Sequence, residues 1–128
     1  MDLQIEPELQ GDLLLVTCAG TVTLDSAVSV FKEVIDLVAE KRVHKFLINM
    51  LAVSGTLSTF DRYEFGSKIA EYLAELGIHS LSIACVGIPP TIDGFAARVA
   101  QNRDVDVDVF PTLEKALDWL GRRQNSSP

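Results

Sequence analysis

Apolar segments of strand length alternate with helical patterns through most of this chain, and this alternation limits its fold more than any other feature. Residues 46–51 are almost continuously apolar, and residues 80–86 form a second buried strand-like segment. Continuous apolar character is typical of strands in parallel sheets, because both faces of such sheets are covered. The stretches between these segments carry apolar residues at the spacing of one helix face. The pattern predicts a parallel sheet packed by helices.

The predicted element order is β-β-α-β-α-β-α-β-α. Strands are expected at residues 3–9, 13–19, 46–51, 80–86 and 105–109, and helices at 24–41, 59–76, 91–102 and after Thr112. Gly11 predicts a hairpin between the first two strands, and residues 20–23 are expected to be a loop. The fold class is therefore α/β with a mainly parallel or mixed central sheet. We expect one domain at residues 1–121 and a disordered polar tail at 122–128.

Composition excludes several classes of function. The chain has 128 residues and a net charge of −7, with 48% hydrophobic residues. An acidic protein of this kind has no general affinity for nucleic acid or anionic membranes, since both require a basic surface. No apolar segment reaches the length of a membrane span, and the first residues do not form a secretory signal. We expect a cytoplasmic protein in which Cys18 and Cys85 are reduced core thiols.

No catalytic or metal-binding pattern is present in the sequence. His44 and His79 have no motif partner, and the known nucleotide and hydrolase motifs are absent. Asp104, Asp106 and Asp108 alternate along a strand, which places them on one solvated face rather than around an ion. We therefore expect no enzyme activity, no metal and no cofactor.

The most promising site is a polar loop between the third strand and the second helix. Residues 53–62 carry several hydroxyls directly before the expected helix N-terminus. Ser58 has Asp61 three residues later, which resembles a capping box. Ser58 is therefore either a helix cap alone or also a regulated hydroxyl, because a helix N-terminus receives anions readily.

Two aromatic residues of the second helix do not join its expected core face. That face contains Phe65, Ile69, Tyr72, Leu73 and Leu76, whereas Phe60 and Tyr63 project away from it. The two rings either pack under a neighbouring loop or the first helix, or they form an exposed patch for a partner or an apolar ligand. Gly66 in mid-helix indicates the close approach of another backbone.

These features together resemble the STAS domain, the fold of bacterial anti-sigma factor antagonists and of sulfate-transporter tails. The resemblance spans residues 3–120. The family's usual Asp-Ser-Ser-Gly loop is replaced here, with Leu57 and Phe60 at the Asp and Gly places. Residues 55–64 and 87–93 are closer to a divergent SpoIIAA-like branch, whose fold is also similar to the lipid-binding Sec14 (CRAL-TRIO) domain.

The resemblance implies a non-catalytic regulatory module that docks a partner through the loop 54–58 and the start of the second helix. The partner would be an anti-sigma-factor-like kinase or another regulator, and phosphorylation of Ser58 would control binding. A self-dimer through the same surface is an alternative. The expected contact residues are Ser54, Thr56, Ser58, Thr59, Phe60, Arg62 and Tyr63. The second hypothesis, which follows from the Sec14 likeness, is an apolar-ligand cleft near Tyr63, Ile88 and Phe95.

Overall fold

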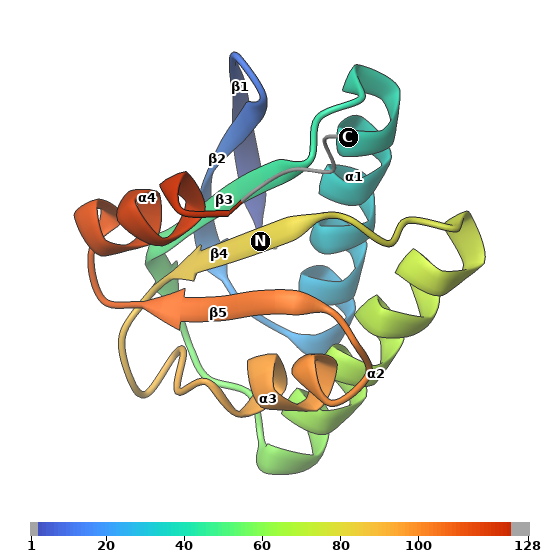
Figure 1. Ribbon diagram of the computed structural model, residues 1–128. Helices are drawn as coiled ribbons and strands as arrows, with labels where there is room; N and C mark the ends of the chain where they lie inside the picture. Colours follow the sequence, from blue (N-terminus) through green and yellow to red (C-terminus); the bar gives the residue numbers. More distant parts are fainter. Residues whose placement is uncertain (1–2, 124–128) are drawn as a thin grey trace.

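Within residues 3–123, which this computed structural model describes, five strands form one mixed sheet (Figure 1). Their order in space, β1-β2-β3-β4-β5, repeats their order along the chain. β1 (Gln4–Gln10) pairs antiparallel with β2 (Leu13–Thr21). β3 (Lys45–Ser54), β4 (Ser82–Val86) and β5 (Asp106–Phe110) follow in parallel. The predicted α/β class and mixed sheet are confirmed.

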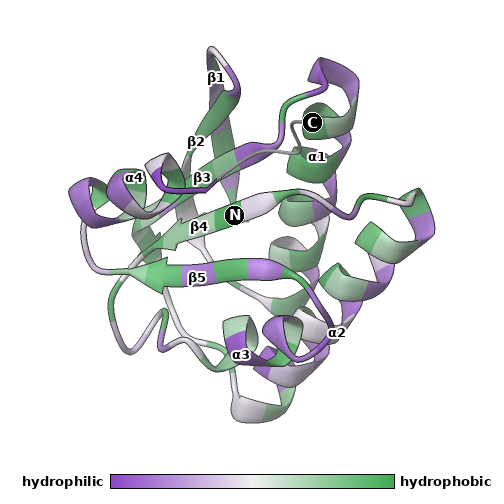
Figure 2. Ribbon diagram, in the orientation of Figure 1, coloured by the Kyte–Doolittle hydropathy of each residue, from purple (hydrophilic) through white to green (hydrophobic). Residues whose placement is uncertain are grey.

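The helices cover the two faces of the sheet unequally (Figure 1). α1 (Leu24–Lys41), α2 (Thr59–Leu76) and α3 (Phe95–Gln101) pack on one face and share a large apolar core with it. α4 (Leu113–Gly121) covers the other face through a smaller cluster. Figure 2 shows the hydrophobic residues concentrated on the strands and on the inner sides of the helices.

Side-chain alternation along β3 explains how one strand serves both cores. Phe46 and Ile48 are fully buried in the larger cluster, and Leu47 between them is buried in the cluster under α4. Successive side chains of a strand point to opposite faces. An almost continuously apolar strand is therefore required wherever helices lie on both sides.

Capping residues fix the helix ends close to where the sequence predicts them. α1 and α2 have the predicted bounds, and Thr23, Ser58 and Thr112 are the N-caps of α1, α2 and α4. Each hydroxyl accepts a hydrogen bond from the backbone N–H three residues later. Gly77 ends α2 in the left-handed conformation, with φ of 71°, which glycine adopts without steric cost.

Four predicted boundaries differ from the structure by two residues or more, and one of them is the start of β4, at Ser82 instead of residue 80. β2 and β3 run on to Thr21 and Ser54, because parallel pairing resumes beyond an irregularity at Thr17/Ala19. Residues 20–21 and 52–54 are therefore strand rather than loop. α3 begins at Phe95 instead of residue 91, because Gly94 has a φ of 87° and is not helical.

Two residues of the expected tail, Arg122 and Arg123, belong to the part of the chain that the structure describes. Arg122 pairs with Asp118, and the Arg123 guanidinium lies 3.9 Å from the centroid of the Trp119 ring and pairs with Asp106. These contacts tie residues 122 and 123 to α4 and β5. The remainder of the predicted tail, residues 124–128, lies outside the described residues.

Candidate partner-docking site

Two loops meet at the carboxyl ends of the central strands. Residues 55–58 connect β3 to α2, and residues 87–94 connect β4 to α3. Because β3 and β4 are parallel neighbours, both loops leave the sheet at the same edge. This edge is where parallel α/β sheets commonly place their binding sites.

Arg62, in the first turn of α2, joins the two loops. Its guanidinium donates to Thr56 Oγ1 at 2.7 Å and to the carbonyl of Pro90 at 2.6 Å, and it pairs with the Asp93 carboxylate. The Arg62 side chain is only 14% exposed. A planar guanidinium can donate to several acceptors at once, so the Arg62 side chain fixes the two loops relative to each other.

Hydroxyl groups strengthen this connection. Thr56 Oγ1 donates to the Pro90 carbonyl at 3.0 Å, and Thr91 Oγ1 donates to the Gly55 carbonyl at 2.9 Å. Ser54 is the last residue of β3, and its Oγ donates to the Gly20 carbonyl at 3.3 Å. Ser54, Thr56 and Arg62, which the sequence predicts as contact residues, therefore already bond within the chain.

Ser58, Thr59 and Phe60 are three consecutive exposed residues of the predicted site. Ser58 Oγ accepts from the Asp61 N–H at 3.0 Å, and Ser58 is an exposed residue. Phe60 is 69% exposed, which is the highest value among the exposed large hydrophobic residues of the described chain. The ring does not pack under a loop or against α1, so the alternative of an exposed aromatic patch is the one observed.

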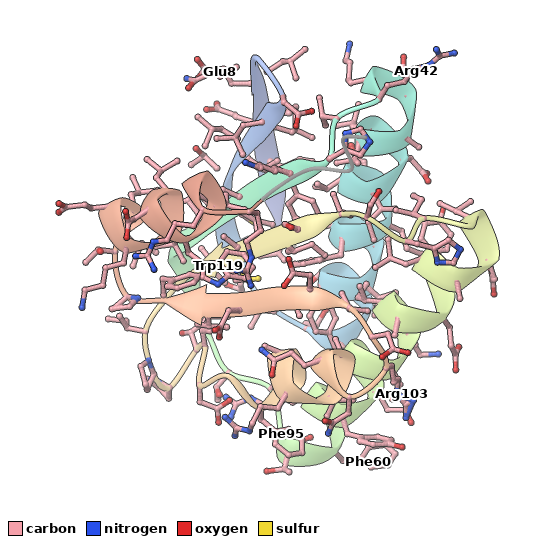
Figure 3. The ribbon with its side chains drawn as sticks, viewed as in Figure 1. Glu8, Arg42, Phe60, Phe95, Arg103 and Trp119 are labelled. Carbon is pink, nitrogen blue, oxygen red and sulfur yellow. The ribbon has the colours of Figure 1, made fainter. Side chains whose placement is uncertain are left out.

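Tyr63 lies one turn after Phe60 and is partnered by Arg103, just beyond α3. Arg103 Nη2 donates to Tyr63 Oη at 3.1 Å, and the guanidinium lies 5.7 Å from the centroid of the ring. The Arg103 hydrogen bond lowers the pKa of Tyr63. Figure 3 shows Phe60, Phe95 and Arg103 gathered at one end of the molecule, where α2 and α3 meet.

α3 packs against the part of α2 that follows Tyr63 in the sequence. Gly66 and Ala70 are buried, although the helical pattern places them away from the predicted core face. Leu76, predicted in that core face, is 44% exposed. α2 is therefore buried on two sides, one facing the sheet and one facing α3, and Gly66 permits the second contact.

A small apolar cavity lies between the sheet and the three helices that share its face. Its volume is about 80 Å³, compared with roughly 300–1,000 Å³ for pockets that bind small molecules. Tyr63, Ile88 and Phe95 are not among its lining residues in the described chain, and Ile88 is 53% exposed at the surface. Leu57, Arg62, Thr91 and Asp93 lie at its edge nearest the two loops.

The other candidate groups have structural roles. Asp106 accepts from Ser82 Oγ and from Arg123, and its strand β5 is an edge of the sheet. Within residues 3–123, no cluster of three or more potential ligand side chains could hold a metal ion. Cys18 and Cys85 are free and buried, as predicted. In the same range, no helix is long and apolar enough to span a membrane.

Several solved structures share this fold over nearly their whole length. An anti-sigma factor antagonist from Mycobacterium paratuberculosis matches with a TM-score of 0.63 and 17% identity, over 94% of this chain and 95% of that one. A putative anti-sigma factor antagonist from Thermotoga maritima matches with a TM-score of 0.62 and 15% identity, over 92% and 95%. No family model and no curated protein matches the sequence.

A further solved structure links this fold to the SpoIIAA-like proteins. It is an uncharacterised DUF3478-family protein from Shewanella loihica with a SpoIIAA-like fold, with a TM-score of 0.56 and 20% identity over 93% of this chain and 94% of that one. The fold of this chain is therefore the SpoIIAA-like (STAS) fold of anti-sigma factor antagonists, as the sequence resemblance implies.

Some residues of the site were not predicted from the sequence. Asp93 and Arg103 lie 31 and 40 residues from their partners Arg62 and Tyr63. No local sequence pattern signals such a pairing, because it depends on where α3 packs relative to α2. The Pro90 carbonyl, which accepts hydrogen bonds from Thr56 and Arg62, also has no sequence signature for this role.

Proposed function

We propose that the protein is a non-catalytic regulatory module that binds a partner protein through residues 54–58 and the first turns of α2. The observation that carries the proposal is the 69% exposure of Phe60 on a helix start whose loop is held in place by Arg62. A large exposed aromatic side chain on a rigid frame is typical of interaction sites. The anti-sigma factor antagonists that share the fold support a regulatory role.

Ser58 supplies a means of control in this proposal. A phosphate on Ser58 would place up to about two negative charges at the N-terminus of α2, beside the exposed Phe60. The helix dipole favours an anion at this position, so the modified helix would remain folded while its exposed surface became more negative. We propose that phosphorylation of Ser58 releases the partner, and that the partner or an associated protein is the kinase.

The docking proposal is tested by affinity capture from the source cells with quantitative mass spectrometry. Wild type, Phe60→Ala and Tyr63→Ala are compared with Leu76→Ala as control, since Leu76 is also exposed on α2 but at its other end. We expect Phe60→Ala to reduce recovery of a specific partner by about tenfold or more, and Leu76→Ala to leave it unchanged. Equal recovery with all variants would contradict the proposal.

Self-association is separated from partner binding by the same variants. Analytical ultracentrifugation of the purified protein measures whether a dimer forms and whether Phe60→Ala abolishes it. Intact-mass analysis of wild type and Ser58→Ala from the source cells tests the phosphate. A phosphate that persists on Ser58→Ala, or that is absent from wild type, would contradict control at this residue.

The apolar-ligand alternative receives less support. The cavity of about 80 Å³ is small for an acyl chain, since an engineered apolar cavity of about 150 Å³ binds molecules no larger than benzene or xenon. A lipid would require α2 and α3 to separate, which would disrupt the close contact at Gly66. Native mass spectrometry of protein purified from the source cells should therefore show no retained lipid.

A further inference from the structure

We propose that Arg103 makes the docking surface selective for a partner segment that presents a carboxylate beside an apolar side chain. The proposal rests on the proposed function, because it concerns the same surface. The inference specifies the chemistry of the partner segment, and it adds Arg103, which lies outside the loop 54–58 and α2, to the docking surface.

The first observation is that Arg103 is held in a defined position by Tyr63. The phenol oxygen accepts from Nη2 at 3.1 Å, and the guanidinium lies 5.7 Å from the ring centroid. The backbone of Arg103 is fixed as well, since its N–H donates to the Ala100 carbonyl at 2.9 Å at the end of α3. A side chain that is already positioned loses little conformational entropy when it binds.

The second observation is that Arg103 has no carboxylate partner within residues 3–123. Arg62, Arg122 and Arg123 each pair with an aspartate in that range. Glu64 follows Tyr63 directly in α2, yet it forms no ion pair with Arg103 in the described chain. The charge of Arg103 is therefore not neutralised by a direct ion pair, and a guanidinium has further N–H donors beyond the one that Tyr63 uses.

The third observation is the arrangement of apolar and cationic groups. Phe60 lies one helical turn before Tyr63 and is 69% exposed, and Figure 3 shows Phe60 and Arg103 at the same end of the molecule. An arginine held against Tyr63, with the exposed Phe60 one helical turn away, has the composition of an interaction hot spot. A matching segment would place an apolar side chain on Phe60 and an aspartate or glutamate on Arg103.

The overall charge of the protein restricts the partner further. The net charge is −7, so a strongly acidic segment would be repelled by the rest of the surface. Screening limits this repulsion to about 8 Å at physiological salt. A single carboxylate in direct contact with Arg103 is therefore favoured over an acidic tract.

The test uses a display library of random peptides, each of about 12 residues, the length of a short docking segment. The library is selected on immobilised wild type and on four variants: Arg103→Glu, Arg103→Lys, Phe60→Ala and Arg42→Glu. Arg42 is an exposed arginine at the end of α1 that also forms no ion pair in the described chain, and it lies at the opposite end of the molecule from Arg103 (Figure 3). Arg42→Glu therefore reproduces the charge change at a distant position.

We expect wild type and Arg42→Glu to enrich peptides with an aspartate or glutamate beside an apolar residue. Arg103→Glu should bind those peptides about tenfold more weakly or worse and should enrich lysine or arginine at the same position. Arg103→Lys, which keeps the charge, should retain part of the binding. Thermal unfolding of each variant confirms that it is folded before selection.

The outcomes separate the inference from the function on which it rests. If Phe60→Ala loses the partner from cells and the peptides, but Arg103→Glu selects the same peptides as wild type, the inference is wrong and the docking site stands. If wild type enriches no acidic position, or no peptide at all, the inference is also wrong. If Phe60→Ala keeps the partner from cells, the proposed function itself fails.

Discussion

Gly66 of α2 lies directly against the backbone of Ala96 in α3. A Cβ atom added at Gly66 would come within 2.6 Å of the Ala96 carbonyl oxygen and 3.0 Å of Val99 Cβ. Real Cβ atoms do not approach a backbone oxygen so closely, so the two helices can pack at this distance only because residue 66 has no side chain. The contact sets the position of α3, and therefore of Arg103 beside Tyr63.

Gly66→Ala should destabilise the protein although alanine is the better helix former. Alanine in place of glycine ordinarily gains about 1 kcal/mol in a helix interior. Here α3 must move to admit the methyl group, and overpacking of this kind costs about 1–3 kcal/mol or more. We expect the free energy of unfolding, measured in urea, to fall by up to about 2 kcal/mol.

Gly121→Ala is the matched control, because a Cβ at Gly121 of α4 meets no atom within 4 Å. It should leave stability unchanged or raise it by about 0.5 kcal/mol. Similar effects of the two substitutions would show that the Gly66 contact is not tight.

Replacing Arg62 should loosen the loop that carries Ser58. Arg62→Ala removes the donors to Thr56 and Pro90 and the pair with Asp93. We expect the free energy of unfolding to fall by about 1–2 kcal/mol. This is less than for a buried ion pair, because the Asp93 side chain is 38% exposed. Hydrogen exchange should accelerate in residues 55–58 and 87–94.

The control for Arg62 is Arg122→Ala. Arg122 pairs with Asp118, but the two side chains are 71% and 61% exposed. Exposed pairs of this type contribute less than about 0.5 kcal/mol on a helix. Equal losses from the two substitutions, or unchanged exchange in both loops of Arg62→Ala, would argue against the role given to Arg62.

The two tyrosines should titrate in separate steps. The hydrogen bond from Arg103 lowers the pKa of Tyr63, whereas the hydrogen bond from Tyr72 to Asp36 raises the pKa of Tyr72. Ultraviolet absorbance of tyrosinate in a Tyr72→Phe variant follows Tyr63 alone. Adding Arg103→Leu should raise its pKa toward the ordinary value of 10.0. An unchanged titration would contradict the contact on which the selectivity proposal depends.

Cys85 should make stability fall in alkaline solution. Burial, with a smaller effect of the Asp108 charge, raises the pKa of Cys85 from 9.0 to about 12. The folded protein thus keeps its thiol protonated while the unfolded chain ionises. The resulting stability is complete below pH 9 and is lost as the pH rises toward 12.

The comparison is with Cys85→Ala, in urea unfolding at several values between pH 8 and pH 11. Wild type should lose stability relative to the variant by up to about 1.4 kcal/mol per pH unit above pH 9. Parallel profiles for the two proteins would contradict the raised pKa.

The sequence predicts the fold well because its signals are local. The helices 24–41 and 59–76 have clear caps at Thr23 and Ser58, and both bounds agree with the structure. Boundaries that depend on tertiary pairing were missed, such as the extension of β3 to Ser54, which needs the partner strand β2. Helical projection placed Phe60 and Tyr63 off the core correctly. It failed for Ala70, because the position of α3 has no signature within α2.

The candidate site was predicted less completely for the same reason. Ser58 as a cap and Phe60 as an exposed ring follow from residues within one turn. The use of Arg62 inside the structure depends on Pro90 and Asp93, which belong to a loop after the next strand. The sequence therefore singles out a candidate site, but it does not predict which of the polar residues there are already bonded within the chain.

The strand order described above has a consequence for how the chain is made. Since each strand lies beside its predecessor, each strand after β1 leaves the ribosome when the strand that it pairs with has already been synthesised. The pairing of two consecutive strands closes a segment of chain little longer than one helix, so the entropic cost of this loop closure is small. The face that carries Phe60 is completed when α3 arrives, and α4 then covers the opposite face. The sheet can thus be built in one direction, from the amino to the carboxyl end, without waiting for a distant segment.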